Sequence, residues 1–207
     1  MKNYIINWAR KLRAIANNGL LYAETIYHKE RYEAIMNISI EMFSNASISS
    51  EAEIKAIFSN EEGYSTPKID VRAVVPFENK LLFVNENDDN LWCFPGGWLE
   101  IGETIRGTIE KEVLDEAGYK VKASKLLGIY DKDLHEDAPT SPYQVFTVYV
   151  LCEILKKETE DLKLETNAAA FFGENEIPII SKNRISIHQV QRMFEYIENG
   201  EIFPDFD

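Results

Sequence analysis

Cysteine is scarce in this sequence: there are two among 207 residues, Cys93 and Cys152. Each lies inside an apolar run, so we expect buried free thiols in a reducing compartment rather than disulfide cross-links. Long apolar runs are also missing, and basic side chains at residues 10–13 interrupt the apolar positions near the N-terminus. The sequence therefore predicts neither a signal peptide nor a membrane span, and we expect a cytoplasmic protein.

Positive charge is in deficit. The chain has 22 Lys and Arg against 35 Asp and Glu, which gives a formal net charge of -13. This balance argues against a broad basic surface for nucleic acid, and we expect no DNA partner. Nucleotides stay possible, because a bridging cation lets an acidic site hold phosphates. With 45% apolar and 28% charged residues, the chain is an ordinary globular one that can bury a sizeable core.

The first part of the chain is predicted to be helical. Apolar residues recur at helical spacing over residues 5–15, and we expect this helix to end at the Asn-Asn-Gly of residues 17–19. A second helix is predicted over 22–42 and a third over 50–58, where a capping box opens it. Three short helices bury little core by themselves. We therefore predict a domain over residues 1–62 that forms a homodimer; the alternative is a helical cap on a monomer.

Residues 63–207 are predicted to form a second domain that is rich in strands. Two β-branched apolar runs, 71–77 and 81–85, are separated by Glu-Asn-Lys, as in a hairpin. The longest such run, 145–154, is predicted to be a central strand. A capping box at Ser186 predicts a helix near the C-terminus. The order of elements is typical of an α/β domain with a mixed sheet.

Residues 94–119, FPGGWLEIGETIRGTIEKEVLDEAGY, bear the acidic residues of greatest interest. A Pro-Gly-Gly turn follows a short apolar run, and a helical pattern then ends at Gly118, which is placed as a C-cap. Glu112 and Glu116 are four positions apart, so their carboxylates project from one helix face beside Asp115. A hard cation such as Mg²⁺ would convert their repulsion into coordination. From these three residues alone, a solvated acidic face is the alternative.

This stretch resembles the Nudix box, G-x5-E-x7-R-E-U-x-E-E-x-G-U, in which U is aliphatic. The matching positions are Gly97, Glu103, Lys111, Glu112, Val113, Asp115, Glu116, Gly118 and Tyr119. Lys111 replaces the arginine and lacks its planar fork, and Tyr119 replaces an aliphatic residue. Asp115 is one methylene shorter than the glutamate of the pattern, which leaves open whether it ligates a metal directly or through water.

The resemblance implies a Nudix α/β/α sandwich, here preceded by a small helical domain, and a hydrolase that uses Mg²⁺ or Mn²⁺. Residues 62–72 and the helical N-terminus are similar to a bacterial Nudix branch that acts on nucleoside diphosphates linked to a group X. Members of that branch resemble ADP-ribose or CDP-choline pyrophosphatases, and the sequence does not choose between these substrates. A silent Nudix-fold nucleotide sensor is the alternative, and a hydrolase of oxidised nucleoside triphosphates is a third reading.

The resemblance also implies a metal site. Its ligands would be the carboxylates of Glu112 and Glu116, with the Gly97 carbonyl nearby and Asp115 direct or through water. Bound divalent ions would clamp the pyrophosphate oxygens and lower the pKa of a bound water. Clustered carboxylates of this kind are expected to titrate as a coupled set.

Further residues are predicted to serve catalysis or substrate binding. Glu103 would orient the attacking water or a ligand carboxylate, and Glu165 is our candidate general base from outside the box. Trp98 follows the glycine turn and is a candidate to stack on a nucleobase. Lys111 is expected to pair with box carboxylates. Arg72, at a strand start, is a candidate for phosphate contact, with a surface ion pair as the alternative.

Overall fold

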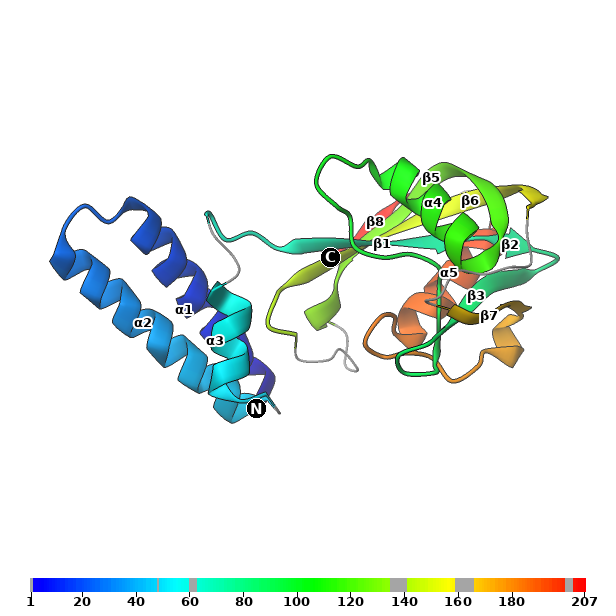
Figure 1. Ribbon diagram of the computed structural model, residues 1–207. Coiled ribbons are helices and arrows are strands. Elements are labelled where there is room, and N and C mark those ends of the chain that lie inside the picture. The colour runs from blue at the N-terminus through cyan, green and yellow to red at the C-terminus, as the bar shows by residue number, and fades with distance from the viewer. Residues whose placement is uncertain (1, 48, 60–62, 135–140, 159–165, 200–202) are drawn as a thin grey trace. The chain divides into compact units, whose positions relative to one another are not determined.

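The computed structural model describes residues 2–47, 49–59, 63–134, 141–158, 166–199 and 203–207 (Figure 1). The chain divides into two compact units. The first comprises Met1–Lys68 with Thr140–Gln144, and the second comprises Ile69–Pro139 with Val145–Asp207. In the described ranges, no helix combines the length and the apolar character needed to cross a membrane.

The first unit consists of helices α1 (Lys2–Tyr22), α2 (Ile26–Ala46) and α3 (Glu51–Ser59), with α1 and α2 side by side (Figure 1). The expected end of α1 at Asn-Asn-Gly is wrong, because the helix continues for another turn. Gly19 serves packing instead: a Cβ there would lie 2.3 Å from the ring of Tyr32 on α2. Glycine therefore allows the two helices to approach closely.

The start of α3 follows its sequence signal, whereas the predicted start of the second helix at residue 22 is wrong: α2 begins at Ile26, with Thr25 as its N-cap. Ser50 and Glu53 form the predicted capping box, in which the Ser50 N–H donates to Glu53 Oε2 at 2.8 Å. The Glu53 N–H donates back to Ser50 Oγ at 3.3 Å. The three helices share a small core, whose buried side chains are Ile6, Ala9, Ile40, Phe43, Ala46, Ile54 and Phe58.

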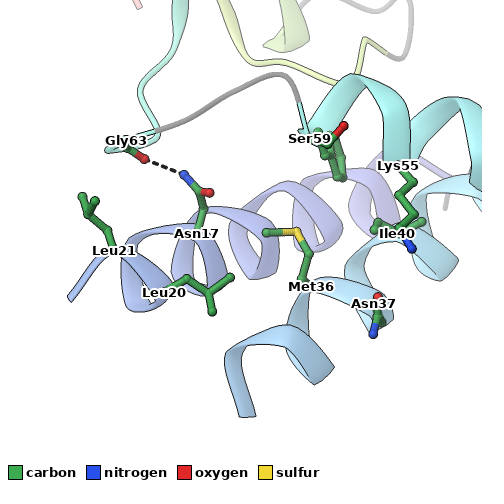
Figure 2. Close-up of a pocket in the computed structure, with 10 residues that line it drawn as sticks. Asn17, Leu20, Leu21, Met36, Asn37, Ile40, Lys55, Ser59 and Gly63 are labelled. Carbon is green, nitrogen blue, oxygen red and sulfur yellow. Dashed lines mark hydrogen bonds between the residues drawn. The ribbon is translucent and has the colours of Figure 1, made fainter. Parts of the chain in front are cut away.

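A cavity of about 500 Å³ lies within the helical unit. Figure 2 shows Leu20, Leu21 and Met36 on its wall, together with the hydrogen bond from Asn17 Nδ2 to the Gly63 carbonyl at 2.6 Å. The wall combines apolar side chains with Asn, Ser and Lys, and contains none of the predicted site residues. It therefore belongs to the packing of the helices rather than to the acidic site.

The described residues of the second unit form two four-stranded sheets. One has the strand order β1-β6-β5-β8, and in the other β3 pairs with β2, β4 and β7. Strand bounds are β1 Lys68–Val74, β2 Pro76–Phe77, β3 Lys80–Glu86, β4 Trp92–Cys93, β5 Tyr119–Asp131, β6 Val145–Lys157, β7 Thr166–Phe172 and β8 Asp205–Phe206. The first sheet is mixed, since β5 is antiparallel to β6 and parallel to β8.

The sequence runs map onto these sheets with one correction. The predicted strand 71–77 is two strands, β1 and β2, which belong to different sheets. Pro76 lacks the N–H needed to continue a ladder, so the chain changes sheet there. The hairpin between β2 and β3 is confirmed, and Glu78 and Asn79 form its turn with φ of 49° and 63°. Strand β6 lies between β1 and β5, as predicted for a central strand.

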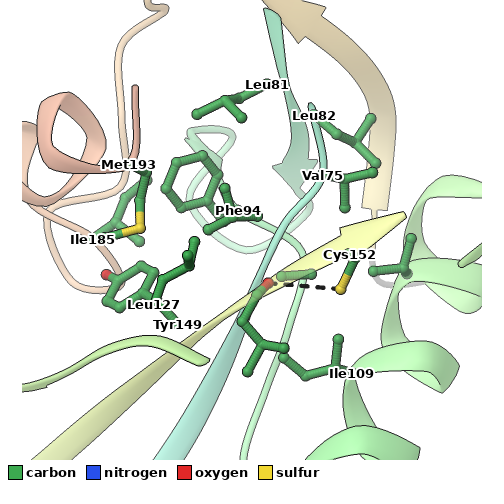
Figure 3. Packing of buried hydrophobic residues seen from close by; sticks show 14 of the residues in the cluster. Val75, Leu81, Leu82, Phe94, Ile109, Leu127, Tyr149, Cys152, Ile185 and Met193 are labelled. Carbon is green, nitrogen blue, oxygen red and sulfur yellow. Dashed lines mark hydrogen bonds between the residues drawn. The ribbon is translucent and has the colours of Figure 1, made fainter. Parts of the chain in front are cut away.

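Helices α4 (Ile105–Ala117) and α5 (Ile187–Asn199) complete the second unit, with short 3₁₀ turns at Lys132–Leu134 and Glu174–Glu176. Figure 3 shows Ile109 of α4 and Met193 of α5 pointing into one core from opposite sides of the strands. The capping box at Ser186 is confirmed by hydrogen bonds of 2.9 and 3.2 Å with Gln189. The expected α/β class with a mixed sheet and N-terminal helices is therefore confirmed.

Candidate active site

The glycine turn of residues 94–97 lies directly against strand β1. The backbone N–H of Val71 donates a hydrogen bond of 2.8 Å to the carbonyl of Gly97. Gly96 has a φ of +144°, and a Cβ on it would lie 2.0 Å from the carbonyl oxygen of Val71. Only glycine fits at this distance from the strand, which explains the residue type in the motif.

Helix α4 presents the acidic residues of the box. Its N-cap Thr104 accepts a hydrogen bond of 3.1 Å from the Gly107 N–H. At the other end of α4, Gly118 has a left-handed backbone conformation with φ of 73°. Its N–H donates a hydrogen bond of 3.0 Å to the carbonyl of Leu114. The C-cap prediction for Gly118 is confirmed. These caps set both the length and the rotation of α4.

Glu116 is the most deeply buried acid of the box, with 5% of its surface exposed. Its Oε2 accepts a hydrogen bond of 2.9 Å from the Gly96 N–H. Burial raises the pKa of Glu116 to about 8, and the nearby carboxylates of Glu86 and Glu112 act in the same direction. The Arg72 guanidinium and the Gly96 N–H act in the opposite direction but do not outweigh burial.

Glu112 lies next to the glycine turn. Its carboxyl carbon is 3.9 Å from the position that a Cβ would take on Gly97. The structure therefore brings together three of the predicted metal-binding residues: Gly97, Glu112 and Glu116. Asp115 lies on the same helix and is partly buried.

Lys111 and Glu103 lie at the edge of this cluster. Lys111 Nζ is 3.8 Å from Glu112 Oε1 and 4.0 Å from Glu103 Oε1. Glu103 also accepts a hydrogen bond of 2.9 Å from Thr108 Oγ1. Because Lys111 is more than half exposed, these ion pairs contribute little to stability. Their effect is to hold Glu103 beside the start of α4.

The donor set matches a hard divalent cation. Within the part of the chain that the structure describes, no three Asp, Glu, His or Cys side chains converge closely enough to enclose a metal. Mg²⁺ does not need such a cage, because it is commonly bound by one or two carboxylates, water and substrate phosphates. Glu112 and Glu116 satisfy that pattern. A cation beside them would also offset the burial and the nearby carboxylates that raise the pKa of Glu116.

Arg72 is not at the surface, so the expected surface position is wrong. Only 5% of it is exposed, and its Nη2 lies 3.3 Å from Asp70 Oδ2. Burial disfavours the charged guanidinium, but Asp70, Cys93 and Glu116 outweigh this and raise the pKa of Arg72. The predicted strand start is also wrong, because β1 begins at Lys68 and Arg72 lies inside it. The sequence of a strand gives no information on what packs over it, so the burial of Arg72 could not be predicted.

Trp98, in contrast, has an accessible ring. It is 56% exposed directly after the glycine turn, and its backbone forms a bridge with Asp70 of β1. The Lys132 ammonium lies 5.9 Å from the ring centroid and 2.6 Å from Asp70 Oδ2. The exposed ring is therefore held beside Lys132 directly after the glycine turn, where a planar group could stack on it.

Glu86 is an acidic residue of the site that sequence reasoning missed. It lies at the end of β3, where the register with β7 shifts between Asn85 and Glu86. Bulges of this kind redirect side chains, and Glu86 is 8% exposed. Its Oε1 accepts from Cys93 Sγ at 3.1 Å and pairs with Arg184 Nε at 3.2 Å. The signal available in the sequence was that Glu86, a charged residue, directly follows the apolar strand run 81–85.

Glu165, the predicted general base, lies outside the described residues. It stays a prediction.

Comparison with known families agrees with this fold, a helical domain followed by a Nudix-type domain. A family model for the NUDIX domain matches residues 67–193. A second model, described as a UDP-X-like N-terminal oligomerisation domain, matches residues 3–58. The chain belongs to the Nudix hydrolase family and is a pyrophosphohydrolase. This family generally uses divalent metal ions.

Individual relatives extend over much of the chain. A Bacillus subtilis protein with the provisional name ADP-ribose pyrophosphatase YjhB is 36% identical over 199 residues, which cover 96% of this chain and 95% of that protein. A crystal structure of a Streptococcus suis ADP-ribose pyrophosphatase is 34% identical with a TM-score of 0.61, and covers 69% of this chain and 100% of its own. A crystal structure of a UDP-X diphosphatase is 25% identical with a TM-score of 0.63. The match covers 100% of this chain and 99% of that one.

Proposed function

We propose that the protein is a Mg²⁺-dependent hydrolase of a nucleoside diphosphate linked to X, with ADP-ribose as the first candidate substrate. The products are a nucleoside monophosphate and phosphorylated X. The names of the Bacillus and Streptococcus relatives support ADP-ribose. The UDP-X diphosphatase structure spans both domains of this chain, which supports the wider class of linked nucleoside diphosphates. CDP-choline, the other substrate expected from the sequence, stays a candidate within that class.

The observation that carries this proposal is the state of Glu116. It is only 5% exposed, its carboxylate accepts from the Gly96 N–H of the glycine turn, and it lies near Glu86 and Glu112. Burial, with these two carboxylates acting in the same direction, raises its pKa, which supports a role that needs a positive partner. A divalent cation supplies the missing positive charge, neutralises pyrophosphate oxygens and makes a bound water more acidic. Burying the Glu116 carboxylate is unfavourable for the folded state, and we attribute its presence to cation binding rather than to stability.

Each predicted residue then has a separate task. Glu112 and Glu116 hold the cation, with the Gly97 carbonyl and Asp115 beside them. Glu103, fixed by Thr108, orients the attacking water or a ligand carboxylate. Lys111 keeps Glu103 and Glu112 together, and Trp98 offers its ring to the nucleobase. Glu165 stays the candidate general base.

A substrate panel tests the proposal. ADP-ribose, CDP-choline, a UDP-sugar and an oxidised nucleoside triphosphate are each incubated with Mg²⁺ or Mn²⁺, and a coupled phosphatase releases phosphate from the products. We expect cleavage of at least one linked nucleoside diphosphate that EDTA abolishes. Binding of the same compounds without any turnover would support a nucleotide sensor instead. Cleavage of the triphosphate alone would favour a sanitising hydrolase.

We further propose that the helical domain forms a homodimer through one face of α1. The exposed aromatic and aliphatic residues Tyr4, Trp8, Ile15 and Tyr22 are each more than half exposed. They are spaced 4, 7 and 7 residues apart and so lie along one helix face, opposite the buried Ile6. We call these four residues the α1 stripe. An apolar stripe of this length on a soluble helix favours a protein partner.

The pattern of the α1 stripe favours an antiparallel pair. Lys11 and Asn18 lie between its apolar members in heptad-like spacing. In a parallel pair, Lys11 would face the partner's Lys11, and like charges would repel. In an antiparallel pair centred near residue 13, Lys11 faces the partner's Ile15 and Trp8 faces the partner's Asn18. A two-fold axis then makes the stripe complementary to itself.

The oligomeric state tests this interface. Ile15→Glu is compared with Ile38→Glu, which places the same charge at a similarly exposed isoleucine of α2. Light scattering after size exclusion is expected to show a dimer for the wild type and for Ile38→Glu, and a monomer for Ile15→Glu. A monomeric wild type, or dissociation by Ile38→Glu alone, would remove the α1 stripe as the interface.

The cysteines are consistent with the expected cytoplasmic location. Cys93 and Cys152 are both free and buried, and buried thiols of this kind are usual in a reducing compartment. We therefore keep that location as part of the proposal.

A further inference from the structure

The guanidinium of Arg72 is bound to the backbone of the glycine turn. Its Nη1 donates hydrogen bonds of 3.1 Å to the carbonyl of Phe94 and of 3.1 Å to the carbonyl of Gly96. The same nitrogen is 3.6 Å from Cys93 Sγ. A single side chain on β1 therefore contacts every second carbonyl of the turn.

The intervening carbonyls are bound by the backbone of the same strand. The Ala73 N–H donates a hydrogen bond of 2.8 Å to the carbonyl of Pro95. The Val71 N–H donates one of 2.8 Å to the carbonyl of Gly97. All four carbonyls of residues 94–97 thus accept hydrogen bonds from three consecutive residues of β1. The backbone of β1 binds the carbonyls of Pro95 and Gly97, and the Arg72 side chain binds those of Phe94 and Gly96.

Asp70 holds the guanidinium in place, and Lys132 in turn holds the Asp70 carboxylate. Asp70 Oδ2 lies 3.3 Å from Arg72 Nη2 and accepts a hydrogen bond of 2.6 Å from Lys132 Nζ. Asp70 is 2% exposed, so the group is removed from water. Buried ion pairs of this kind are weak sources of stability, because desolvation offsets the attraction. Their retention next to an active site is better explained by the geometry that they impose.

That geometry reaches the chemistry through Gly96. The carbonyl of Gly96 accepts from Arg72, and the N–H of Gly96 donates 2.9 Å to Glu116 Oε2. Arg72 therefore holds the two peptide groups that flank the Pro95–Gly96 peptide, and it is the N–H of that middle peptide that donates to Glu116. We propose that Arg72 is a positioning residue that, by fixing these flanking peptides, sets the direction of the Gly96 N–H and thereby aims Glu116 at its catalytic task, without contacting substrate. The link from Glu116 to turnover rests on the proposed function, whereas the link from Arg72 to Gly96 does not.

The conservative variant Arg72→Lys separates charge from geometry, because a lysine keeps the cation but cannot bind two carbonyls and a carboxylate in one plane. We expect kcat to fall roughly 10- to 100-fold with KM nearly unchanged, since small misplacement of a catalytic group costs about this much. The amide of Gly96, followed by NMR hydrogen exchange in 15N-labelled protein, should lose protection in the same variant.

Arg13→Lys provides the matched control. Arg13 is also buried, at 6% exposed against 5% for Arg72, but it lies in the helical unit over the Phe58 ring. We expect it to lower thermal stability without changing kcat or Gly96 exchange. If Arg72→Lys does not fold, Asp70→Asn is used, which weakens the support of the guanidinium and should change kcat in the same direction.

The outcomes are separable. An increase in KM at constant kcat would show that Arg72 binds substrate directly and would overturn the proposal. Unchanged exchange of the Gly96 amide in Arg72→Lys would overturn it as well. If the wild-type enzyme cleaved no linked nucleoside diphosphate, the proposed function would fail, but the exchange measurement would still decide whether Arg72 positions Gly96.

Discussion

The backbone N–H of Gly96 donates a hydrogen bond of 2.9 Å to Oε2 of Glu116, twenty residues further along the chain. This contact joins the two ends of the Nudix box, the glycine turn and the last turn of α4. It sets the position of one oxygen of a carboxylate that is almost completely buried. The following predictions examine what depends on this contact and on the acids around it.

Replacing the acid should stop catalysis while leaving the fold intact. Glu116→Gln keeps the size and an acceptor for the Gly96 N–H but removes the negative charge. We expect kcat to fall by roughly 100-fold or more, because several kcal/mol of charge stabilisation is lost. Glu110→Gln is the control on the same helix. The Glu110 carboxylate accepts a hydrogen bond of 3.0 Å from the Ala123 N–H, away from the glycine turn, so this change should leave kcat unaltered. Retained turnover in Glu116→Gln would remove the proposed mechanism.

The stability of the metal-free protein should depend on pH through Glu116. Its pKa is raised in the folded state from 4.5 to about 8. The native state therefore binds this proton more tightly, so the contribution to stability is full below about pH 4.5 and is lost as pH rises through about 8. Denaturant unfolding across this range should show wild type losing stability relative to Glu116→Gln, by at most about 1.4 kcal/mol per pH unit. A difference that is constant with pH would contradict this assignment.

Adding Mg²⁺ should reverse that loss. A cation that binds only the native state raises its stability, and the carboxylate ligands must be deprotonated to bind it. We expect Mg²⁺ to raise the melting temperature more at about pH 8 than at about pH 6, and EDTA to cancel the effect. Glu116→Gln should show little of this increase. An equal increase in the variant would place the cation elsewhere.

The glycine turn should not tolerate a side chain. Gly96→Ala places a Cβ 2.0 Å from the Val71 carbonyl at a φ of +144°. We expect a loss of about 3 kcal/mol in the free energy of unfolding and strongly reduced kcat. Gly102→Ala also has a positive φ, of +90°, but no atom lies within 4 Å of its Cβ. It should cost only about 1 to 2 kcal/mol, from backbone strain alone. Equal costs would show that contact with β1 is unimportant.

Local signals in the sequence predicted many local features. The capping boxes at Ser50 and Ser186 and the C-cap at Gly118 involve residues within a few positions of one another, and all three are present. The end of α1 was misread at Gly19, because the reason for that glycine is the Tyr32 ring on another helix. The split of residues 71–77 between two sheets was also missed, although Pro76 marks it.

The sequence by itself determined the family and which acids lie on one face of α4, because motif spacing and helical periodicity are properties of a contiguous chain. Only the tertiary structure decided which polar groups lose contact with water. It buried Arg72 under the glycine turn and added Glu86 to the acids around Glu116. Burial and charge proximity depend on segments that are distant in the chain, and these two quantities set the pKa of Glu116 and the orientation of the turn.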